Sequence, residues 1–412
     1  MGNIQKVRGF QDIYGENARR YRLVVDTARE IFKLYNFKEI ILPYLEDISL
    51  FKRSVGEETD IVQKEMYTFT DRGGRQIALR PEGTASCVRA YIEEKLYGEG
   101  GYHKLFYEGA MFRYERPQAG RYRQFHQVGA EVFGVSSVYA DAEMILMINN
   151  LLKSLNIQTR LEINTLGTFE SRRNYSEALK VYFSQFRDSL CETCRGRLER
   201  NPLRIIDCKV ESCREIAKGS PVITDYISEE SKERFEKLLN LLDRFGINYR
   251  VNPGLVRGLD YYTDTVFEFI TDRIGAQGTV AAGGRYDRLV QQLGGPPTPA
   301  LGFAAGVERL MLLLDSVQEK EKLFSVISLT EDQFPKALEF IETLRKNGIK
   351  GELVLRSGSL KSMMKVADKF KADFVIFVSD RCELKDMKSG EQITFLSDGD
   401  LIDYIIRELK TV

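Results

Sequence analysis

Histidine is almost absent from this chain of 412 residues, which contains only His103 and His126. Catalytic schemes that depend on histidine therefore have little material here. Two common nucleotide-binding signatures are missing as well, since neither a GxxxxGK[ST] phosphate loop nor a strand-linked GxGxxG occurs. These absences disfavour the commonest nucleotide-binding folds.

An excess of charge and a long apolar run are also lacking. Lysine plus arginine number 60 and aspartate plus glutamate number 60, so any phosphate or RNA binding must come from local clusters. No run of roughly eighteen apolar residues predicts a membrane span. The first residues, MGNIQKVRGFQDIYG, lack the apolar core of a signal peptide. Because six cysteines in so long a chain do not indicate a disulfide framework, we expect a cytoplasmic protein without membrane contact.

The composition that is present, with 43% hydrophobic and 29% charged residues, is typical of a globular protein of two or three domains. Residues 167–250 hold two charged amphipathic helices around a cysteine-bearing segment, which indicates a small inserted domain within a larger domain, 1–322. After the charged run DSVQEKEKL, strand and helix patterns alternate. This alternation predicts a small α/β domain at 323–412.

The stretch FRYERPQAGRYRQFHQ, residues 112–127, concentrates four arginines among aromatic residues. Its pattern predicts two strands joined by a Pro- and Gly-containing turn. Alternation along the strands places Arg113 with Glu115 on one face, and Phe125 with Gln127 and Glu131 on one face. A planar guanidinium suits a phosphate, and an aromatic ring suits a purine base. The alternative is a hairpin whose basic tip simply faces water.

Two later segments carry the same mixture of glycine, arginine and aromatic residues. LVRGLDYYTDTVFEF begins at residue 255, and its paired tyrosines are explained equally well by core packing. GTVAAGGRYDRL and LGFAAGVERL surround glycines that allow a ligand to approach the backbone. Arg309 lies early on a helix, where a surface pair between Glu308 and Arg309 is the alternative.

Taken together, these segments resemble the class II histidyl-tRNA synthetases. FKEIILPYLED, FRYERPQAGRYRQFHQVGAEVFG and LGFAAGVERLMLLL are similar to motifs 1, 2 and 3 of class II. LVRGLDYYT and AAGGRYDRL are similar to the two segments peculiar to the histidyl enzymes, and LRPEGTAS at 79–86 also fits. The resemblance implies an α+β catalytic domain built on an antiparallel sheet with a helical insertion, followed by a C-terminal α/β anticodon-binding domain.

The resemblance also implies a function: ATP-dependent activation of L-histidine to histidyl-adenylate and its transfer to tRNA(His), by a homodimer that uses ATP and Mg²⁺. The implied catalytic cations are Arg113 and Arg257. The implied ATP ligands are Arg113, Glu115, Arg121, Phe125 and Arg309. The implied histidine ligands are Glu82, Gly83, Thr84, Gln127, Glu131, Arg257, Tyr261, Tyr262 and Tyr286. Gln118 and Arg123 would face the acceptor end of the tRNA.

Three alternatives stay open at this point. One is a silent paralogue that regulates histidine biosynthesis; the arginines at 113, 257 and 309 and the C-terminal domain count against it. Another class II synthetase is disfavoured by RGLDYYT. An RNA-binding module without catalysis does not explain the ligand-shaped segments outside the hairpin.

Four cysteines in the insertion, Cys191, Cys194, Cys208 and Cys213, raise a separate question. Four thiolates can close a tetrahedral zinc site, and the first pair has the C-x2-C spacing of zinc ligands. The second pair is spaced more loosely than in a zinc ribbon. The spacing alone favours four reduced thiols over structural Zn²⁺.

Overall fold

The computed structural model describes residues 3–56, 59–256, 259, 261–275, 278–315, 322–356, 358–379 and 382–409. The chain divides into two compact units, 1–315 and 316–412, and each is described by itself. Among the described residues, no helix has the length and apolar character that crossing a membrane requires.

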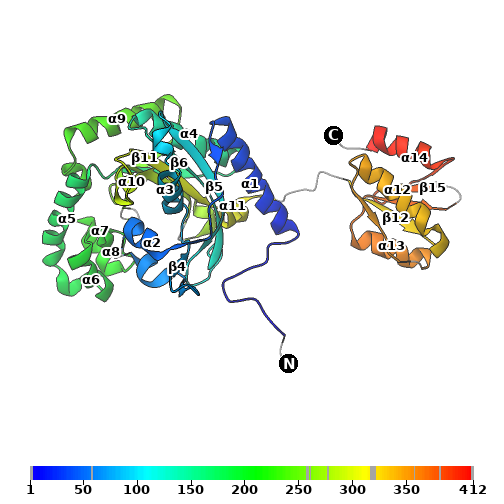
Figure 1. The fold of residues 1–412 in the computed structure, drawn as a ribbon, viewed down its shortest axis with the longest axis horizontal. Helices are drawn as coiled ribbons and strands as arrows, with labels where there is room; N and C mark the ends of the chain where they lie inside the picture. The colour runs from blue at the N-terminus through cyan, green and yellow to red at the C-terminus, as the bar shows by residue number, and fades with distance from the viewer. Residues whose placement is uncertain are drawn as a thin grey trace. The chain divides into compact units, whose positions relative to one another are not determined.

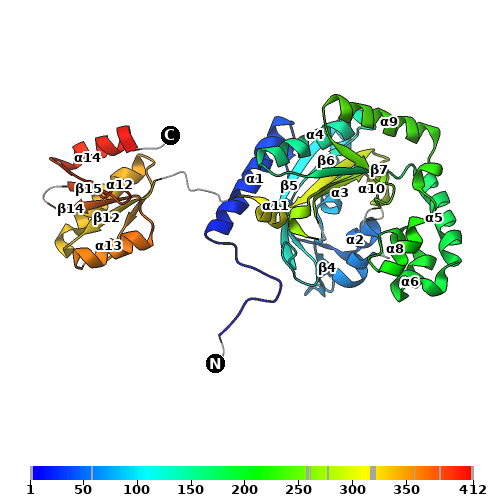
Figure 2. The same cartoon turned by 180° about the vertical axis from the view of Figure 1, so that it is seen from behind.

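The first unit is built on a large, mostly antiparallel sheet (Figures 1 and 2). Within the described residues this sheet has eight strands, and only its outermost pairs, β1 with β5 and β7 with β8, are parallel. In spatial order the strands are β1 (Lys38–Glu39), β5 (His103–Phe112), β6 (Gln124–Phe133), β11 (Ala300–Gly306), β10 (Thr279–Arg285), β9 (Thr263–Ile270), β7 (Arg160–Thr165) and β8 (Tyr249–Val251).

A small antiparallel sheet lies beside it, made of β2 (Leu45–Asp47), β4 (Gln76–Leu79) and β3 (Thr68–Thr70). Because proline cannot donate to a ladder, its position in FKEIILPYLED predicts an edge strand or a strand end. Pro43 falls between β1 and β2 and interrupts neither strand.

Helices cover the faces of the large sheet. Phe32 of α1 packs against Phe106 of β5 and Phe303 of β11, with ring centroids 5.1 and 6.0 Å apart. On β6 the alternate residues face the other way, so that Phe125 and Gln127 line a cavity. The helices outside the insertion are α1 (Glu16–Leu34), α2 (Ile48–Val55), α3 (Thr84–Glu93), α4 (Val138–Ser154), α10 (Leu289–Gln292) and α11 (Val307–Leu313).

The insertion runs from the end of β7 to the start of β8 and is helical (Figure 1, green). Its own core combines aliphatic and aromatic residues with three buried cysteines. Its helices are α5 (Phe169–Ser184), α6 (Glu192–Arg200), α7 (Leu203–Ile206), α8 (Glu211–Lys218) and α9 (Glu229–Arg244).

The second unit is a five-stranded mixed sheet with helices, counted over its described residues. The strand order is β13-β12-β14-β15-β16, parallel through the first three strands and antiparallel through the last two pairs. The alternating pattern of the sequence predicted these strands and helices up to β14, and it did not extend to the β15–β16 hairpin. The elements are β12 (Phe324–Ser328), α12 (Phe334–Lys346), β13 (Gly351–Leu353), α13 (Leu360–Lys369), β14 (Phe374–Val378), β15 (Cys382–Asp386), β16 (Gln392–Phe395) and α14 (Asp398–Tyr404).

Candidate active site

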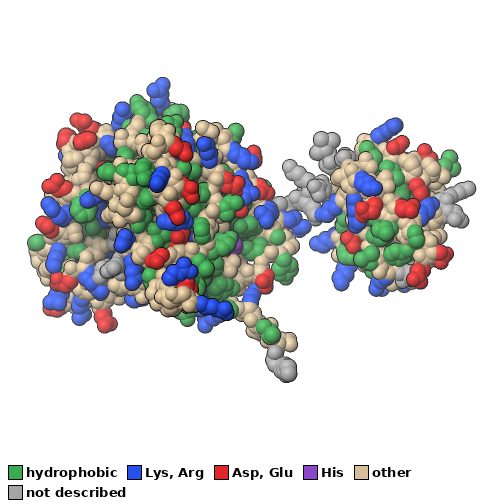
Figure 3. Space-filling model, in the orientation of Figure 1, with side chains coloured by type: hydrophobic (Ala, Val, Ile, Leu, Met, Phe, Trp, Pro, Cys, Tyr) green, Lys and Arg blue, Asp and Glu red, His purple; other side chains and the backbone are tan. Residues whose placement is uncertain are grey.

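A cavity of about 530 Å³ opens on the large sheet and collects side chains that lie far apart in the sequence. Acidic and basic side chains are intermixed over the face of this unit seen in Figure 3, in keeping with the zero net charge. The charge that a ligand meets in the cavity therefore comes from the residues that line it, and not from an excess of one sign over the whole surface. The predicted site residues that line it are Glu82, Thr84, Arg113, Glu115, Arg121, Phe125, Gln127, Tyr261, Tyr262 and Arg309.

One part of the cavity wall carries three arginines and an aromatic ring. Arg113 lies just past the end of β5, where its Nε donates to the carbonyl of Pro81 at 2.9 Å. Its guanidinium carbon lies 5.3 Å from the centre of the Phe125 ring. Arg121 pairs with Glu115 at 3.0 Å, and Arg309 donates to the carbonyl of Thr279. Burial, followed by the neighbouring Arg121 cation, lowers the pKa of Arg309.

Another part of the wall offers acceptors. The Glu82 carboxylate accepts the backbone N–H groups of Thr84 (2.7 Å) and Ala85 (2.8 Å) at the start of α3. Burial raises the pKa of Glu82, while these two hydrogen bonds oppose that shift. The Oε1 atom of Gln127 is buried and has no hydrogen-bond partner among the described residues. A buried acceptor without a partner costs free energy, so the site suits a ligand that donates hydrogen bonds.

Glu131 lies behind this wall, fully buried on β6. Thr84 and Tyr107 donate hydroxyl hydrogen bonds to its Oε1 at 2.7 and 3.0 Å, and Tyr286 donates to its Oε2. Burial raises the pKa of Glu131 to about 8, against the effect of these hydrogen bonds and with a further rise from the Glu82 charge. Near neutral pH, Glu131 thus holds a proton inside a cluster of hydroxyl groups.

The chain that carries this site is similar to known proteins in sequence and in fold. The model of the family described as histidyl-tRNA synthetase matches residues 9–180 and 209–310. The chain belongs to the histidyl-tRNA synthetase family. A histidine–tRNA ligase of Aquifex aeolicus is 53% identical over 95% of this chain and 98% of its own length.

Two further relatives extend the comparison over the full fold. A histidine–tRNA ligase of Maridesulfovibrio salexigens is 45% identical over 97% of this chain and 99% of its own length. The crystal structure of the apo histidyl-tRNA synthetase of S. aureus is 36% identical, covers 98% of this chain and 100% of its own, and has a TM-score of 0.82. The class II fold with a separate C-terminal α/β sheet is therefore established for this chain.

Several residues predicted to form the histidyl-tRNA synthetase site do not line the cavity in this structure. Glu131 and Tyr286 lie behind it, and Gly83 faces Tyr107. Arg123, predicted to face tRNA, stacks on Tyr114 with its guanidinium carbon 3.7 Å from the ring centre. Arg257 lies outside the described residues.

The remaining predicted residues are placed as follows. The backbone of Gln118 closes the turn of the motif 2 hairpin through two hydrogen bonds with Arg121, of 3.0 and 2.9 Å. The rings of Tyr261 and Tyr262 lie 4.7 Å apart, and those of Tyr261 and Tyr286 lie 5.5 Å apart. These three tyrosines form one aromatic cluster beside Glu131.

The sequence missed several polar residues of the cavity. Asp207 and Lys209 come from the insertion, Glu162 and Glu268 from the strands β7 and β9, Asn252 from the residue after β8, and Glu308 from α11. Burial raises the pKa of Asp207, with Lys209 opposing and Glu268 adding to that rise. The side chain of Glu308 is 5% exposed and pairs with Nδ1 of His126 at 2.7 Å. The surface pair between Glu308 and Arg309 considered above is therefore excluded.

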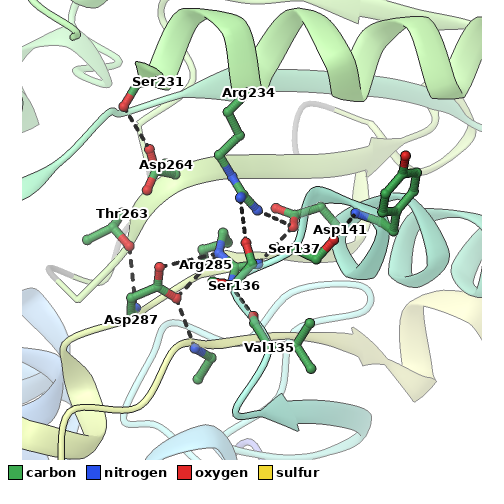
Figure 4. Close-up of polar contacts among 12 residues, drawn as sticks. Val135, Ser136, Ser137, Asp141, Ser231, Arg234, Thr263, Asp264, Arg285 and Asp287 are labelled. Carbon is green, nitrogen blue, oxygen red and sulfur yellow. Dashed lines mark hydrogen bonds and ion pairs between the residues drawn. The ribbon is translucent and has the colours of Figure 1, made fainter. Parts of the chain in front are cut away.

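A buried ionic network fixes the strand ends that carry the tyrosines (Figure 4). Arg285, which immediately precedes Tyr286, donates to Oδ2 of Asp141 at 2.8 Å. Arg234 of α9 donates to the same oxygen at 2.6 Å, and the side chain of Asp141 is fully buried. Aspartate is common at helix N-caps, so the sequence alone predicts Asp141 as the N-cap of this helix, and that prediction is wrong. Ser137 caps α4, and Asp141 lies inside the first turn as the shared partner of two arginines.

Proposed function

We propose that this chain activates L-histidine with ATP to form histidyl-adenylate and transfers the histidyl group to tRNA(His). The observation that carries the proposal is that Arg113 and Arg309 line the same cavity as Glu82, Thr84 and Gln127. The cations suit the phosphates of ATP, and the acceptors suit the ammonium group of an amino acid. The named ligases among the relatives support this function over the regulatory alternative.

In the first step, a carboxylate oxygen of histidine attacks the α-phosphorus of ATP. The new bond joins that oxygen to the α-phosphorus, and the bond from the α-phosphorus to the bridging oxygen breaks, so that pyrophosphate leaves with the electron pair. Negative charge grows on the α-phosphate during this exchange, and a fixed guanidinium such as that of Arg113 stabilises it. No protein nucleophile is required, because two substrates held in one cavity react as a single unit.

ATP would lie between Phe125, whose ring lines the cavity and would stack on adenine, and Arg309, which would bind the terminal phosphates. Mg²⁺ bound to the phosphates would neutralise part of their charge. The carboxylates of Asp207 and Glu268 line the cavity and are oxygen ligands of the kind that Mg²⁺ prefers. Glu268 accepts a hydrogen bond from Thr279 at 2.8 Å, which fixes its orientation.

Selection of histidine would depend on Glu131 and the tyrosines around it. A site whose buried polar groups are satisfied by an imidazole leaves those groups unpaired when an apolar amino acid enters. Thr84 connects the acceptors of the cavity wall with the buried Glu131 cluster, since it lines the cavity and also donates a hydrogen bond to Glu131. The proposed ammonium and imidazole sites would therefore be adjacent.

The test is ATP–pyrophosphate exchange with each of the twenty amino acids. We expect exchange with histidine alone, reduced about 100-fold or more by Arg113→Ala, because a positioned charge on the transition state contributes about 3 kcal/mol or more. Arg123→Ala is the matched control, since Arg123 does not line the cavity. It should retain exchange while lowering the rate of tRNA charging. Exchange with another amino acid would contradict the specificity, and no exchange from folded protein would favour the regulatory alternative.

The motif 1 region supports a homodimer as the working form. Three of its apolar side chains face outward: Ile41 is 88% exposed, Tyr44 53% and Leu45 46%. Exposed apolar side chains that gather on one surface indicate an interaction site, and these three lie within five residues of the chain. Sedimentation velocity should give a dimer for the wild-type chain and a monomer for Ile41→Asp. A wild-type monomer at micromolar concentration would contradict this part of the proposal.

A further inference from the structure

The four insertion cysteines, spread over residues 191–213, converge in the folded chain. Their four Sγ atoms all lie within 4.8 Å of one another, and the Cys191 and Cys208 sulfurs are 3.9 Å apart. A tetrahedral zinc ion with Zn–S bonds of about 2.3 Å holds its sulfurs about 3.8 Å apart. Closing the site around an ion therefore requires side-chain adjustments of about 1 Å or less.

We propose that Cys191, Cys194, Cys208 and Cys213 bind one Zn²⁺ ion through four thiolates and that this ion holds the insertion together. No histidine or carboxylate belongs to the set, and four sulfurs in a tetrahedron select zinc over magnesium or calcium. A disulfide does not account for the cluster, because all six cysteines of the chain are free and a disulfide needs sulfurs about 2.05 Å apart.

Local structure supports thiolates at this place. Cys191 caps α6 and Cys194 lies in its first turn, so the C-x2-C pair presents both sulfurs on one side of the helix start. The backbone N–H of Cys191 donates to the Cys213 sulfur at 3.3 Å, a contact that orients a metal ligand. Residues 191–214 hold six basic and four acidic side chains, and this surplus balances the two net negative charges of a zinc tetrathiolate.

The insertion also needs such a link, because its elements are short. Helices α6, α7 and α8 have 9, 4 and 8 residues, and helices of this length are marginal without tertiary support. Three of the buried residues in this small core are cysteines, which are 0% exposed at Cys194 and Cys213 and 8% at Cys208. Metal coordination is a common substitute for apolar area in cores of this size.

The proposed zinc site lies next to the cavity in the chain. Cys208 lies between Asp207 and Lys209, and both of these neighbours line the candidate active site. The histidyl-tRNA synthetase family model matches residues 9–180 and 209–310, so three of the four cysteines fall outside the matched region. The zinc ion would thus fix one wall of the cavity.

The first experiment is metal analysis of the full-length chain, produced with zinc and iron in the medium and purified without chelator. We expect about one zinc per chain and almost no iron. During titration with a mercurial, which binds thiolates, zinc release should rise linearly and be complete when four equivalents of reagent have been added per chain. Less than a tenth of an equivalent of zinc, or iron in its place, would overturn the proposal.

Substitutions locate the ion. Cys194→Ser and Cys213→Ser should each lower the zinc content at least tenfold, whereas Cys382→Ser, a buried cysteine of the second unit, should retain one zinc. Zinc that persists in both insertion variants would place the ion elsewhere and refute the assignment. If these variants do not fold, the stoichiometry and mercurial release of the wild-type chain still decide the question.

Hydrogen exchange provides a readout that does not depend on activity. Removal of zinc should speed amide exchange at least tenfold in residues 191–218, including Asp207 and Lys209, and leave the β5–β6 hairpin unchanged. Unchanged exchange throughout the insertion after complete zinc removal would show that the ion does not hold this element together.

Discussion

Replacing Glu131 with glutamine should make the protein more stable than the wild type at alkaline pH and leave it nearly unchanged at acidic pH. Glutamine keeps the shape of the side chain and one carbonyl oxygen, which continues to accept from Thr84 and Tyr107. Tyr286, which donates to the other carboxylate oxygen, would reverse its role and accept from the amide. The variant therefore resembles the protonated form of the wild type.

The size and sign of the effect follow from the raised pKa. Glu131 has a pKa of about 8 in the folded chain against an ordinary value of 4.5. Because the native state retains the proton when the unfolded state has released it, the free energy of unfolding falls as the pH rises from 4.5 to 8. A shift of this size corresponds to roughly 5 kcal/mol at about 1.4 kcal/mol for each pH unit. The glutamine variant has no ionisable group at this position, so its unfolding free energy does not fall over this pH range.

The measurement is urea unfolding of wild type and Glu131→Gln at pH 5.5 and pH 9. The difference in unfolding free energy should be only about 1–2 kcal/mol in favour of the variant at pH 5.5, one unit above the ordinary pKa of 4.5, and about 5 kcal/mol in its favour at pH 9. Glu93→Gln, which removes a 65% exposed glutamate of α3, is the control for loss of a surface carboxylate. A difference for Glu131→Gln that does not change with pH would refute the reasoning.

Three further outcomes are expected. Asp141→Asn should lower the free energy of unfolding by about 3 kcal/mol in urea, because it removes the buried carboxylate that Arg234 and Arg285 share and leaves Arg285 only its pair with Asp287 at 3.3 Å; a loss below 1 kcal/mol would contradict this. Gly83→Ala places a Cβ 2.2 Å from Cε2 of Tyr107, so it should cost about 1–3 kcal/mol and raise the KM for histidine. An unchanged unfolding free energy and an unchanged KM for histidine would show that the Tyr107 ring moves aside without cost. Phe125→Ala should raise the KM for ATP by about five- to 100-fold in pyrophosphate exchange, while the KM for histidine changes little; equal changes in both would argue against stacking on adenine.

Much of the site could be predicted because its signals are local in sequence. The arginine-rich hairpin, LRPEGTAS and the segment around Arg309 each combine residue types that bind phosphates or ammonium groups, and the fold brings them to one cavity. Helix positions followed from apolar periodicity, as for α5 and α9. Motif resemblance then supplied the fold class, which no periodicity alone would give.

The parts that could not be predicted depend on contacts between distant segments. Asp141 looked like a helix cap because aspartate is common there, and only the folded chain brings Arg234 and Arg285 to it. Asp207 and Lys209 carry no signal, since charged residues beside a cysteine are ordinary in a surface segment. The convergence of the cysteines was likewise hidden, because linear spacing does not report where α8 packs against α6.

The position of the insertion has a thermodynamic consequence. Residues 166–248 connect β7 to β8, which are adjacent and parallel, and such strands already need a crossover of about a dozen residues. Lengthening a connection that must exist anyway costs only about 0.6 kcal/mol for each doubling, or about 2 kcal/mol here. A module at this crossover therefore adds little to the free-energy cost of forming the large sheet, so it can add new contacts to the cavity without a change in the strands that position Arg113 and Glu131.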